Sequence, residues 1–386
     1  MRYFRILPPI VRDKRAGNLH CSRMNLKREA ATVAASRSWS LAWALLLAGA
    51  GTVLAQPAPV VAPYPPSQVI RRIDWAPAET IIRKAHDSDN WPMTWADDDA
   101  LYTAYGDGSG FEPFVPEKLS LGLAKVTGTP PAFSGENLRA PSIEQRGEGQ
   151  RGRKASGLLC VDAVLYLWTR NANNAQLAWS GDHGATWNWT DWKFTNSFGC
   201  PTFLNFGRDY AGARDSFVYL YSPDSDSAYE AVDHLVLARV PKTKIRERGG
   251  YEFFTGLQAG QAAWSSDLGR RTAVLSASGQ CYRPGLSYSP GLKRFLLVQP
   301  IPTAASRDRA GKIDTRFAGG LAIYDAPDPW GPWTTAFFTS QWDVAPGDSA
   351  HFPTKWMSGD GRTLCLVFSW GDNFCVRKAQ IEVLDH

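Results

Sequence analysis

The sequence lacks the motifs of several common enzyme classes. It has no G-x-S-x-G for the nucleophile elbow of an α/β-hydrolase, no H-E-x-x-H for a zinc peptidase and no P-loop. No G-x-G-x-x-G follows an expected strand, and the glycine-rich run at 106–110 opens no helix. These absences exclude nucleotide binding and serine or zinc hydrolysis of those types.

Cysteine is scarce and shows no metal-binding spacing. After residue 55 the cysteines are Cys160, Cys200, Cys281, Cys365 and Cys375. None forms a C-x-x-C or a zinc-type pair with histidine, and His351 with Asp372 alone does not define a site, so we predict no metal centre. Cys365 and Cys375 flank a turn, which leaves open a disulfide across a hairpin, although buried free thiols are the preferred interpretation.

Helical periodicity is almost absent after residue 70. Short apolar or alternating runs are separated by Gly, Pro, Asp and Asn turns, which is the pattern of an all-β chain. With 386 residues, 44% of them apolar, the chain can bury a substantial core. Its 16 Trp fit either stacking on sugar rings or the filling of space between sheets.

The first 55 residues have the form of a secretory signal. A short apolar run from Ser38 to Gly51 follows the basic residues Lys27, Arg28 and Arg37, and small residues follow it. The run is short for a membrane span, so a retained anchor is the weaker alternative. We therefore expect a secreted or periplasmic protein with a signal peptide at 1–55, a Pro-rich linker at 56–69 and one domain at 70–386, without membrane contact beyond the cleaved signal.

Removal of the leader changes the charge of the protein. Residues 1–55 contain nine Lys/Arg and two Asp/Glu, so 33 of the 42 basic and 35 of the 37 acidic residues remain. The net charge falls from +5 to near −2, which removes the main support for nucleic-acid binding.

One hairpin pattern recurs five times along the chain. The first strands are expected at 91–95, 157–161, 200–204, 282–286 and 352–356, and the second strands at 100–105, 164–169, 216–221, 294–299 and 363–369. Further strand-like segments such as Leu235 to Val240 and Gly320 to Tyr324 follow them. Repeated antiparallel sheets of this kind predict an all-β, five-bladed β-propeller of four-stranded antiparallel sheets, whereas a β-sandwich would need no repeat.

The segment 180–187 (SGDHGATW) fits the Asp-box pattern S-x-D-x-G-x-T-W. Asp182 is expected to accept backbone N–H bonds in a tight turn, Gly184 to allow the left-handed conformation, and Trp187 to pack between sheets. Such turns lie on the outer hairpin of a blade, so we interpret Asp182 as structural.

Several segments resemble a known group of propellers. They are GDG at 106–108, DHLVLARVP at 233–241, YEFFTG at 251–256 and YDAPDPWGPW at 324–333. With them, residues from about 70 to 384 resemble the five-bladed propellers of the domain-of-unknown-function family 4185, which are related to the clan of glycoside hydrolase family 43. The resemblance implies carboxylate-dependent cleavage of furanoside polymers. It also implies that a Ca2+ ion can occupy the central channel, although we predict no cofactor from the residues themselves.

Propeller geometry selects the residues of the site. Starts of first strands and ends of second strands meet on one face, at the mouth of the channel, which puts the acidic turn 97–99 on the opposite side. The residues expected to bind substrate at the mouth are Asp87, Trp91, Lys154, Arg170, Arg283, His351, Trp370 and Asp372. Arg170, Arg283 and Arg316 are also, by number only, candidates for the arginine triad of a sialidase.

Glycoside cleavage requires one protonated and one ionised carboxyl group. We predict Asp89 and Asp107 as this pair, because both lie at the mouth within one hairpin, with Asp226 or Glu230 as the reserve acid. Structural turn capping is the alternative role for Asp89 and Asp107.

The resulting hypothesis is a monomeric secreted glycoside hydrolase that acts on a furanoside-containing polysaccharide or glycan. A non-catalytic carbohydrate-binding propeller is the alternative, and a structural module with its channel filled by the 135–155 loop is the third. Paired carboxylates in a concave pocket favour the enzyme, and a flat aromatic shelf favours the binding module.

Overall fold

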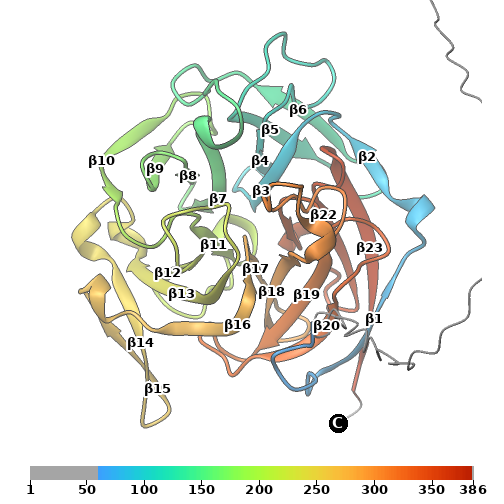
Figure 1. The fold of residues 1–386 in the computed structure, drawn as a ribbon. Coiled ribbons are helices and arrows are strands. Elements are labelled where there is room, and N and C mark those ends of the chain that lie inside the picture. The colour runs from blue at the N-terminus through green and yellow to red at the C-terminus, as the bar shows by residue number, and fades with distance from the viewer. Residues whose placement is uncertain (1–59, 385–386) are drawn as a thin grey trace, which may run out of the picture. The chain divides into compact units, whose positions relative to one another are not determined.

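The computed structural model of the protein describes residues 60–384. These residues form 23 strands and eight short 3-10 helices, arranged as antiparallel sheets around a central axis (Figure 1). None of the helices in this range is long and apolar enough to cross a membrane. The predicted signal at 1–55 and the start of the predicted linker lie outside the described residues.

The first two blades are regular four-stranded sheets. Blade one consists of β3 (Asp89–Trp95), β4 (Leu101–Gly106), β5 (Gly122–Thr127) and β6 (Ser134–Leu138). Blade two consists of β7 (Lys154–Val161), β8 (Val164–Arg170), β9 (Ala175–Ser180) and β10 (Asn188–Phe194). All neighbouring strands in each blade pair antiparallel, from the axis outward.

Blades three and four are joined along their inner strands. Blade three contains β11 (Thr202–Asn205), β12 (Phe217–Pro223), β13 (Val232–Pro241), β14 (Glu252–Gln258), β15 (Gln261–Ser265) and β16 (Ala273–Cys281). Blade four contains β17 (Gly285–Ser289), β18 (Arg294–Ile301), β19 (Gly320–Ala326) and β20 (Thr334–Thr339). A short parallel pairing of β11 with β17 links the two sheets. In blade three both β14 and β16 pair with β13, so this blade departs from the four-stranded pattern that the sequence predicts.

The fifth blade is built from both ends of the described chain. It contains β21 (Ala350–His351), β22 (Thr363–Phe368) and β23 (Phe374–Val383), and its outer edge is formed by β1 (Ile70–Trp75) and β2 (Ile82–Lys84). Both outer strands pair antiparallel with β23. Before β1, Tyr64 packs edge-on against Tyr324, and Pro66 forms a bridge with Thr335 in blade four.

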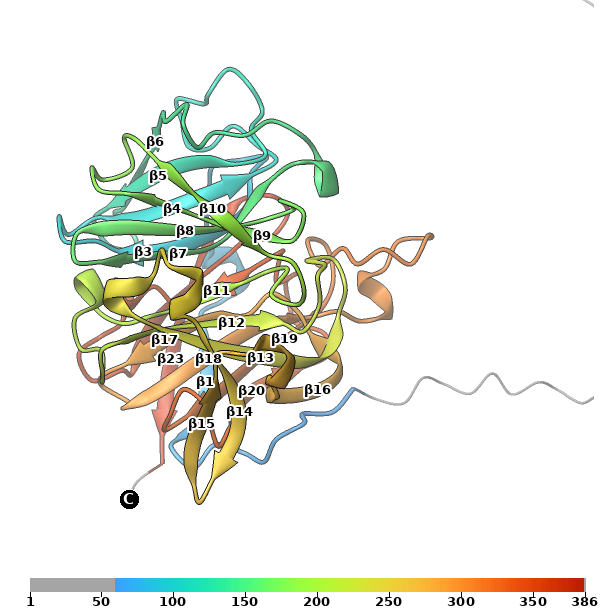
Figure 2. The same cartoon turned by 90° about the vertical axis from the view of Figure 1, so that its left-hand side faces the viewer.

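The 3-10 helices lie in the connections. They are η1 (Ala78–Thr80), η2 (Gly149–Arg151), η3 (Arg208–Tyr210), η4 (Lys242–Lys244), η5 (Arg248–Gly250), η6 (Leu268–Arg270), η7 (Ala304–Ser306) and η8 (Thr354–Trp356). Two long connections, one carrying η2 and one between β18 and β19, extend to the right-hand side of the molecule in Figure 2. Both belong to the side on which inner strands begin.

The apolar runs of the sequence become strands that are buried on both faces. Every residue of β4 and β19 is buried, because each blade packs between two neighbours. The core lies between blades, as in the cluster in which Trp91 of blade one contacts Phe374 of blade five. The propeller fold is confirmed, and each blade contains the predicted antiparallel pair of inner strands.

One strand boundary is wrong, and the preferred interpretation of the cysteines as buried free thiols is confirmed. The first strand of blade five is β21 at Ala350–His351 rather than 352–356, where η8 follows instead. Cys365 pairs in register with Lys378, and Cys375 with Phe368, so the two thiols are not opposite each other. All five cysteines of the described residues are buried free thiols.

Candidate active site

A cavity of about 430 Å³ opens at the mouth of the channel, where the inner strands begin. Four carboxylates line this mouth cavity: Asp89, Asp107, Asp314 and Asp348.

Five cationic side chains line the same cavity: Lys154, Arg170, Arg283, Lys312 and Arg316. Lys154 and Arg170 are almost completely buried, with 2% and 1% of their surfaces exposed. Burial of charged groups is costly unless they are paired, so their positions indicate a polar site rather than a solvated rim.

Asp89 begins β3 and is 5% exposed. Its Oδ1 accepts a hydrogen bond from the side-chain amide of Asn90 at 2.7 Å. Gly106, opposite Asp89 across the β3–β4 ladder, permits this packing, because a Cβ there would lie 2.5 Å from Asp89 Oδ1. Burial, followed by repulsion from Asp348, raises the pKa of Asp89 to about 7. Asp89 therefore holds a proton near neutral pH.

Asp348 lies in the connection that leads from β20 into β21. It forms an ion pair of 2.8 Å with Arg283, which itself is buried and donates from Nε to the Ala228 carbonyl. Burial raises the pKa of Asp348, but the combined attraction of Arg283, Arg170 and the other nearby cations outweighs burial and holds the pKa below its usual value. Asp348 is therefore ionised where Asp89 is protonated.

Asp107 follows β4 and forms an ion pair with the buried Lys154 at the start of β7. Its other oxygen accepts a hydrogen bond of 3.2 Å from the Gly149 backbone in η2. Tyr229 and Asn171 hold the same helix, since both donate to the Gly149 carbonyl. One part of the 135–155 loop therefore forms a wall of the cavity.

Four residues at or next to the mouth cavity have a strained backbone. Asn90, Trp91, Asp107 and Arg283 have φ angles of 77°, 71°, 44° and 36°, although none is glycine. A positive φ is an outlier for a bulky residue and costs on the order of 1–3 kcal/mol. Strain of this kind clusters at functional sites, where the surrounding structure enforces it.

The channel continues below the mouth as a second cavity of about 680 Å³. Arg170 and Arg283 line both spaces, so their guanidinium groups form the floor of the mouth cavity. His351 lies in the lower space, where burial lowers its pKa to about 4 and keeps it neutral. Among the described residues, no carboxylate lines this lower space. A Ca2+ ion in this part of the channel would have to be held by carbonyl, amide and water oxygens, and the ion implied by the resemblance stays a prediction.

The structure brings together five of the residues predicted for the site. They are Asp89, Asp107, Lys154, Arg170 and Arg283. Asp372 lies beside them and binds Arg316 at 2.9 Å, and burial raises its pKa. His351 is in the channel below the mouth.

The positions predicted for the other site residues need correction. Trp91 is 0% exposed because the bulge after Asn90 turns it into the core, so it cannot stack on a sugar. Trp370 packs against Arg83, 4.6 Å from the ring centroid, outside the cavity. Asp87 is exposed and does not line it.

The reserve acids also lie outside the mouth cavity. Asp226 and Glu230 are exposed, and they accept hydrogen bonds from Asn174 and Ser225, respectively. Tyr229, next to Glu230, lines the cavity in their place. The connection between β12 and β13 therefore contributes an aromatic ring rather than a carboxylate.

Sequence reasoning missed Asp348, Asp314 and Lys312. Asp348 lies two residues before β21, and the predicted start of this strand was two residues too late to select it. With the correct start of β21, the rule that first strands begin at the mouth selects Asp348. Asp314 and Lys312, like Arg316, lie in the long connection between β18 and β19, where the sequence carries no signal for position.

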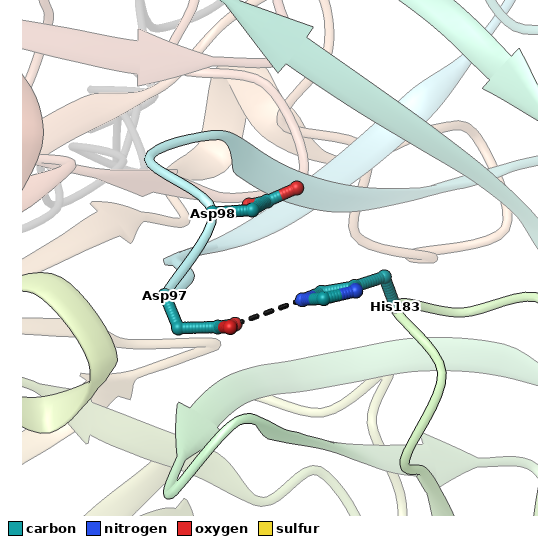
Figure 3. Close-up of side chains that lie close together, drawn as sticks. All are labelled: Asp97, Asp98 and His183. Carbon is teal, nitrogen blue, oxygen red and sulfur yellow. Dashed lines mark hydrogen bonds and ion pairs between the residues drawn. The ribbon is translucent and has the colours of Figure 1, made fainter.

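A second acidic cluster lies at the β3–β4 turn (Figure 3). Asp97 contacts His183 Nε2 at 2.9 Å, and Asp98 forms an ion pair with Lys125 at 2.9 Å. The Asp97 carbonyl also accepts from Arg208. These groups already have protein partners, and they join the turn of blade one to the turn at 180–187, so the cluster has a structural explanation.

The turn at 180–187 has its own hydrogen bonds. Asp182 Oδ1 accepts from Ser180 Oγ at 2.7 Å and from the Thr186 backbone at 2.8 Å, and Trp187 Nε1 donates to the Gly184 carbonyl at 3.0 Å. The turn joins β9 to β10 at the outer edge of blade two, away from the mouth cavity.

The fold and the polar mouth define a five-bladed propeller with a charged pocket on its axis. Among solved structures, the chain is similar to the catalytic domain of a GH62 α-L-arabinofuranosidase from Coprinopsis cinerea, with 11% identity, a TM-score of 0.48, and coverage of 83% of this chain and 100% of that one. It is also similar to the GH43_1 enzyme from Xanthomonas citri complexed with xylotriose, with 13% identity, a TM-score of 0.43 and coverage of 80% and 91%. A third similar structure is the exo-β-1,3-galactanase from Phanerochaete chrysosporium, with 9% identity, a TM-score of 0.41 and coverage of 79% and 64%.

No protein-family model and no curated protein matches the chain. The resemblance to family 4185 therefore remains a prediction from the motifs, and the chemistry of the site is argued from the residues of this chain.

Proposed function

We propose that this protein is a secreted glycoside hydrolase whose reaction takes place in the mouth cavity. One observation carries the proposal: two buried aspartates of one cavity, Asp89 and Asp348, have pKa values displaced in opposite directions. Glycosidic cleavage needs such a pair, because one group donates a proton while the other acts as a base or nucleophile.

Asp89 is the proposed general acid. Its pKa of about 7 leaves a large protonated fraction at pH 6–7, so it can protonate the glycosidic oxygen of the leaving group. Asp348 is the proposed base or nucleophile, since the surrounding cations keep it ionised. This assignment replaces Asp107 in the predicted pair, because Asp348 raises the pKa of Asp89 more than Asp107 does.

Asp107 retains a positioning role in the proposal. Its ion pair with Lys154 and its bond to Gly149 connect the starts of blades one and two. Loss of this contact would move η2 and change the shape of the cavity rather than remove the proton donor.

The expected substrate is a furanoside-containing polysaccharide or glycan. This finer proposal rests on the motifs shared with family 4185, and secretion rests on the pattern of residues 1–55. The concave shape of the cavity and its four carboxylates favour hydrolysis over binding alone, since Trp91 and Trp370 form no aromatic shelf at this mouth.

The test is a screen of the purified protein against aryl furanosides and plant or bacterial polysaccharides. We expect release of reducing ends by the wild type and none by Asp89→Asn. Binding of a polysaccharide without release of reducing ends by the wild type would instead identify a carbohydrate-binding propeller.

A further inference from the structure

The mouth cavity contains more cations than an aspartate pair needs. Five cationic side chains and four carboxylates line the cavity, and Asp372, which pairs with Arg316, makes the two numbers equal. The site is therefore positive while Asp89 holds its proton. Neutral sugars need hydrogen bonds and not a net positive charge, so this charge calls for an explanation within the cavity itself.

Ion pairs account for two of the three arginines. Arg316 is held by Asp314 and Asp372, at 2.8 Å and 2.9 Å. Arg283 is held by Asp348 at 2.8 Å. Each of these guanidinium groups has a carboxylate of its own.

Arg170 differs from both. It lies at the end of β8, is 1% exposed, and forms no ion pair with any residue between 60 and 384. One Nη donates to the Asn90 side-chain oxygen at 2.8 Å, and the Tyr229 ring lies 5.4 Å from its guanidinium carbon. Its Nε is buried and has no hydrogen-bond partner among these residues.

Asp348 attracts Arg170 only from beyond ion-pair distance, so no carboxylate in the described part of the chain contacts this guanidinium. Burial of a guanidinium without a carboxylate in contact is costly. A ligand with a carboxylate would supply that contact. Tyr229 supports the arrangement, because its ring lies 5.0 Å from Arg283 and 5.4 Å from Arg170 and so separates the two cations. The planar fork of a guanidinium matches the two oxygens of a carboxylate.

We propose that the glycan bound in the mouth cavity carries a carboxylate, as a uronic acid does, and that Arg170 is the ligand for it. This inference rests on the proposed function only in calling the ligand a substrate. It narrows the substrate class from furanoside glycans in general to acidic ones. The same oxyanion chemistry is present in sulfated sugars, which the experiment separates from carboxylates.

The experiment measures binding without turnover. The binding of D-galacturonate and D-glucuronate is compared by NMR titration with that of D-galactose, D-glucose and galactose 6-sulfate, for the wild type and for Arg170→Gln. We expect the wild type to bind a uronate at least about tenfold more tightly than the matching neutral sugar, and Arg170→Gln to lose that preference. Arg214→Gln, which removes an exposed arginine elsewhere, is the control and should keep it.

Two further arms keep the result decisive. Binding of the uronate by the wild type without any hydrolysis of uronate-containing glycans would reject the proposed reaction and leave this inference intact. Should Arg170→Gln not fold, the comparison of sugars with the wild type alone decides. Equal affinity for uronate and neutral sugar, or a preference for the sulfated sugar, would overturn the inference.

Discussion

The β3–β4 hairpin of blade one carries aspartates at both of its ends, and the two groups behave in opposite ways. At the mouth, Asp89 is buried and its pKa is raised to about 7. At the turn on the opposite face, hydrogen bonds from Lys355 and Trp95 lower the pKa of the exposed Asp99. The residue type is the same, so the surroundings set the difference between the two pKa values. Burial and nearby negative charge raise the pKa of Asp89, whereas hydrogen bonds from partners at an exposed position lower that of Asp99.

This comparison shows why an acidic run is a poor guide to a catalytic site. The turn 97–99 has three consecutive aspartates and is the densest acidic segment of the hairpin. Its carboxylates are bound by His183, Lys125 and Lys355, so none is free to transfer a proton. At the mouth, by contrast, each carboxylate comes from a different segment of the chain.

The largest expected effect is on activity, and it distinguishes the two ends of the β3–β4 hairpin. Asp89→Asn should lower kcat about 10³-fold, because the variant cannot donate the proton, while Asp97→Asn should change it less than about twofold. Initial rates on the substrate found by the screen measure both. Equal losses in the two variants would mean that the hairpin acts as a structural unit and that Asp89 is not the acid.

The second prediction compares stability at the mouth and at the turn. Asp348→Asn leaves the buried Arg283 without its counter-ion and should lower the free energy of unfolding by about 3 kcal/mol. The matched change Asp99→Asn should leave the denaturation midpoint within experimental error, since the Asp99 carboxylate is exposed to solvent. An unchanged midpoint for Asp348→Asn would show that the ion pair contributes nothing net.

The third prediction concerns pH. Because the pKa of Asp89 is higher in the folded than in the unfolded protein, the folded state binds an extra proton between about pH 4 and pH 7. The contribution of Asp89 to stability is therefore present below pH 4 and is lost as the pH rises through about 7. Activity should also fall as the pH rises through about 7, since Asp89 then loses the proton that it donates.

Comparison of wild type with Asp89→Asn by chemical denaturation between pH 4 and pH 8 tests this prediction. The difference in stability between the two proteins should change across that interval, with the wild type losing stability relative to the variant. A difference that stays constant would place the pKa of Asp89 at its ordinary value.

The smallest expected effect comes from substituting two glycines, one beside Asp89 at the mouth and one in the turn before β22 of blade five. Gly106→Ala places a methyl group against Asp89 and Asn90 and should lower kcat about tenfold by displacing the acid. Gly359→Ala, in the turn of blade five, meets no atom within 4 Å and should have no effect. Normal activity of Gly106→Ala would mean that the hairpin relaxes without moving Asp89.

Much of the fold was predictable because the repeat is local. Each hairpin carries its turn residues and alternating apolar positions in one short segment, so the sequence alone identifies the blades and, through them, the mouth. Asp89, Asp107 and Lys154 follow directly from that geometry. Arg170 and Arg283 follow from the same rule.

The remaining parts of the site depend on long-range packing. The two-residue strand β21 has too little pattern to fix its own boundary, which hid Asp348. Arg316 reaches the mouth through an 18-residue connection, 302–319, whose path is set by contacts such as that with Asp372. The orientation of Trp91 depends on a bulge with two positive φ angles that no alternating pattern indicates.

The last blade has consequences for how the protein is made. Strand β1 completes its sheet by pairing with β23, so that Ile70 lies opposite Val383. The ring cannot close until nearly the whole domain has been synthesised, and until then two sheet edges remain open to other chains. A fusion partner must therefore be attached before β1 or after β23, because a tag inserted next to either strand inside the domain would break the pairing that closes the ring.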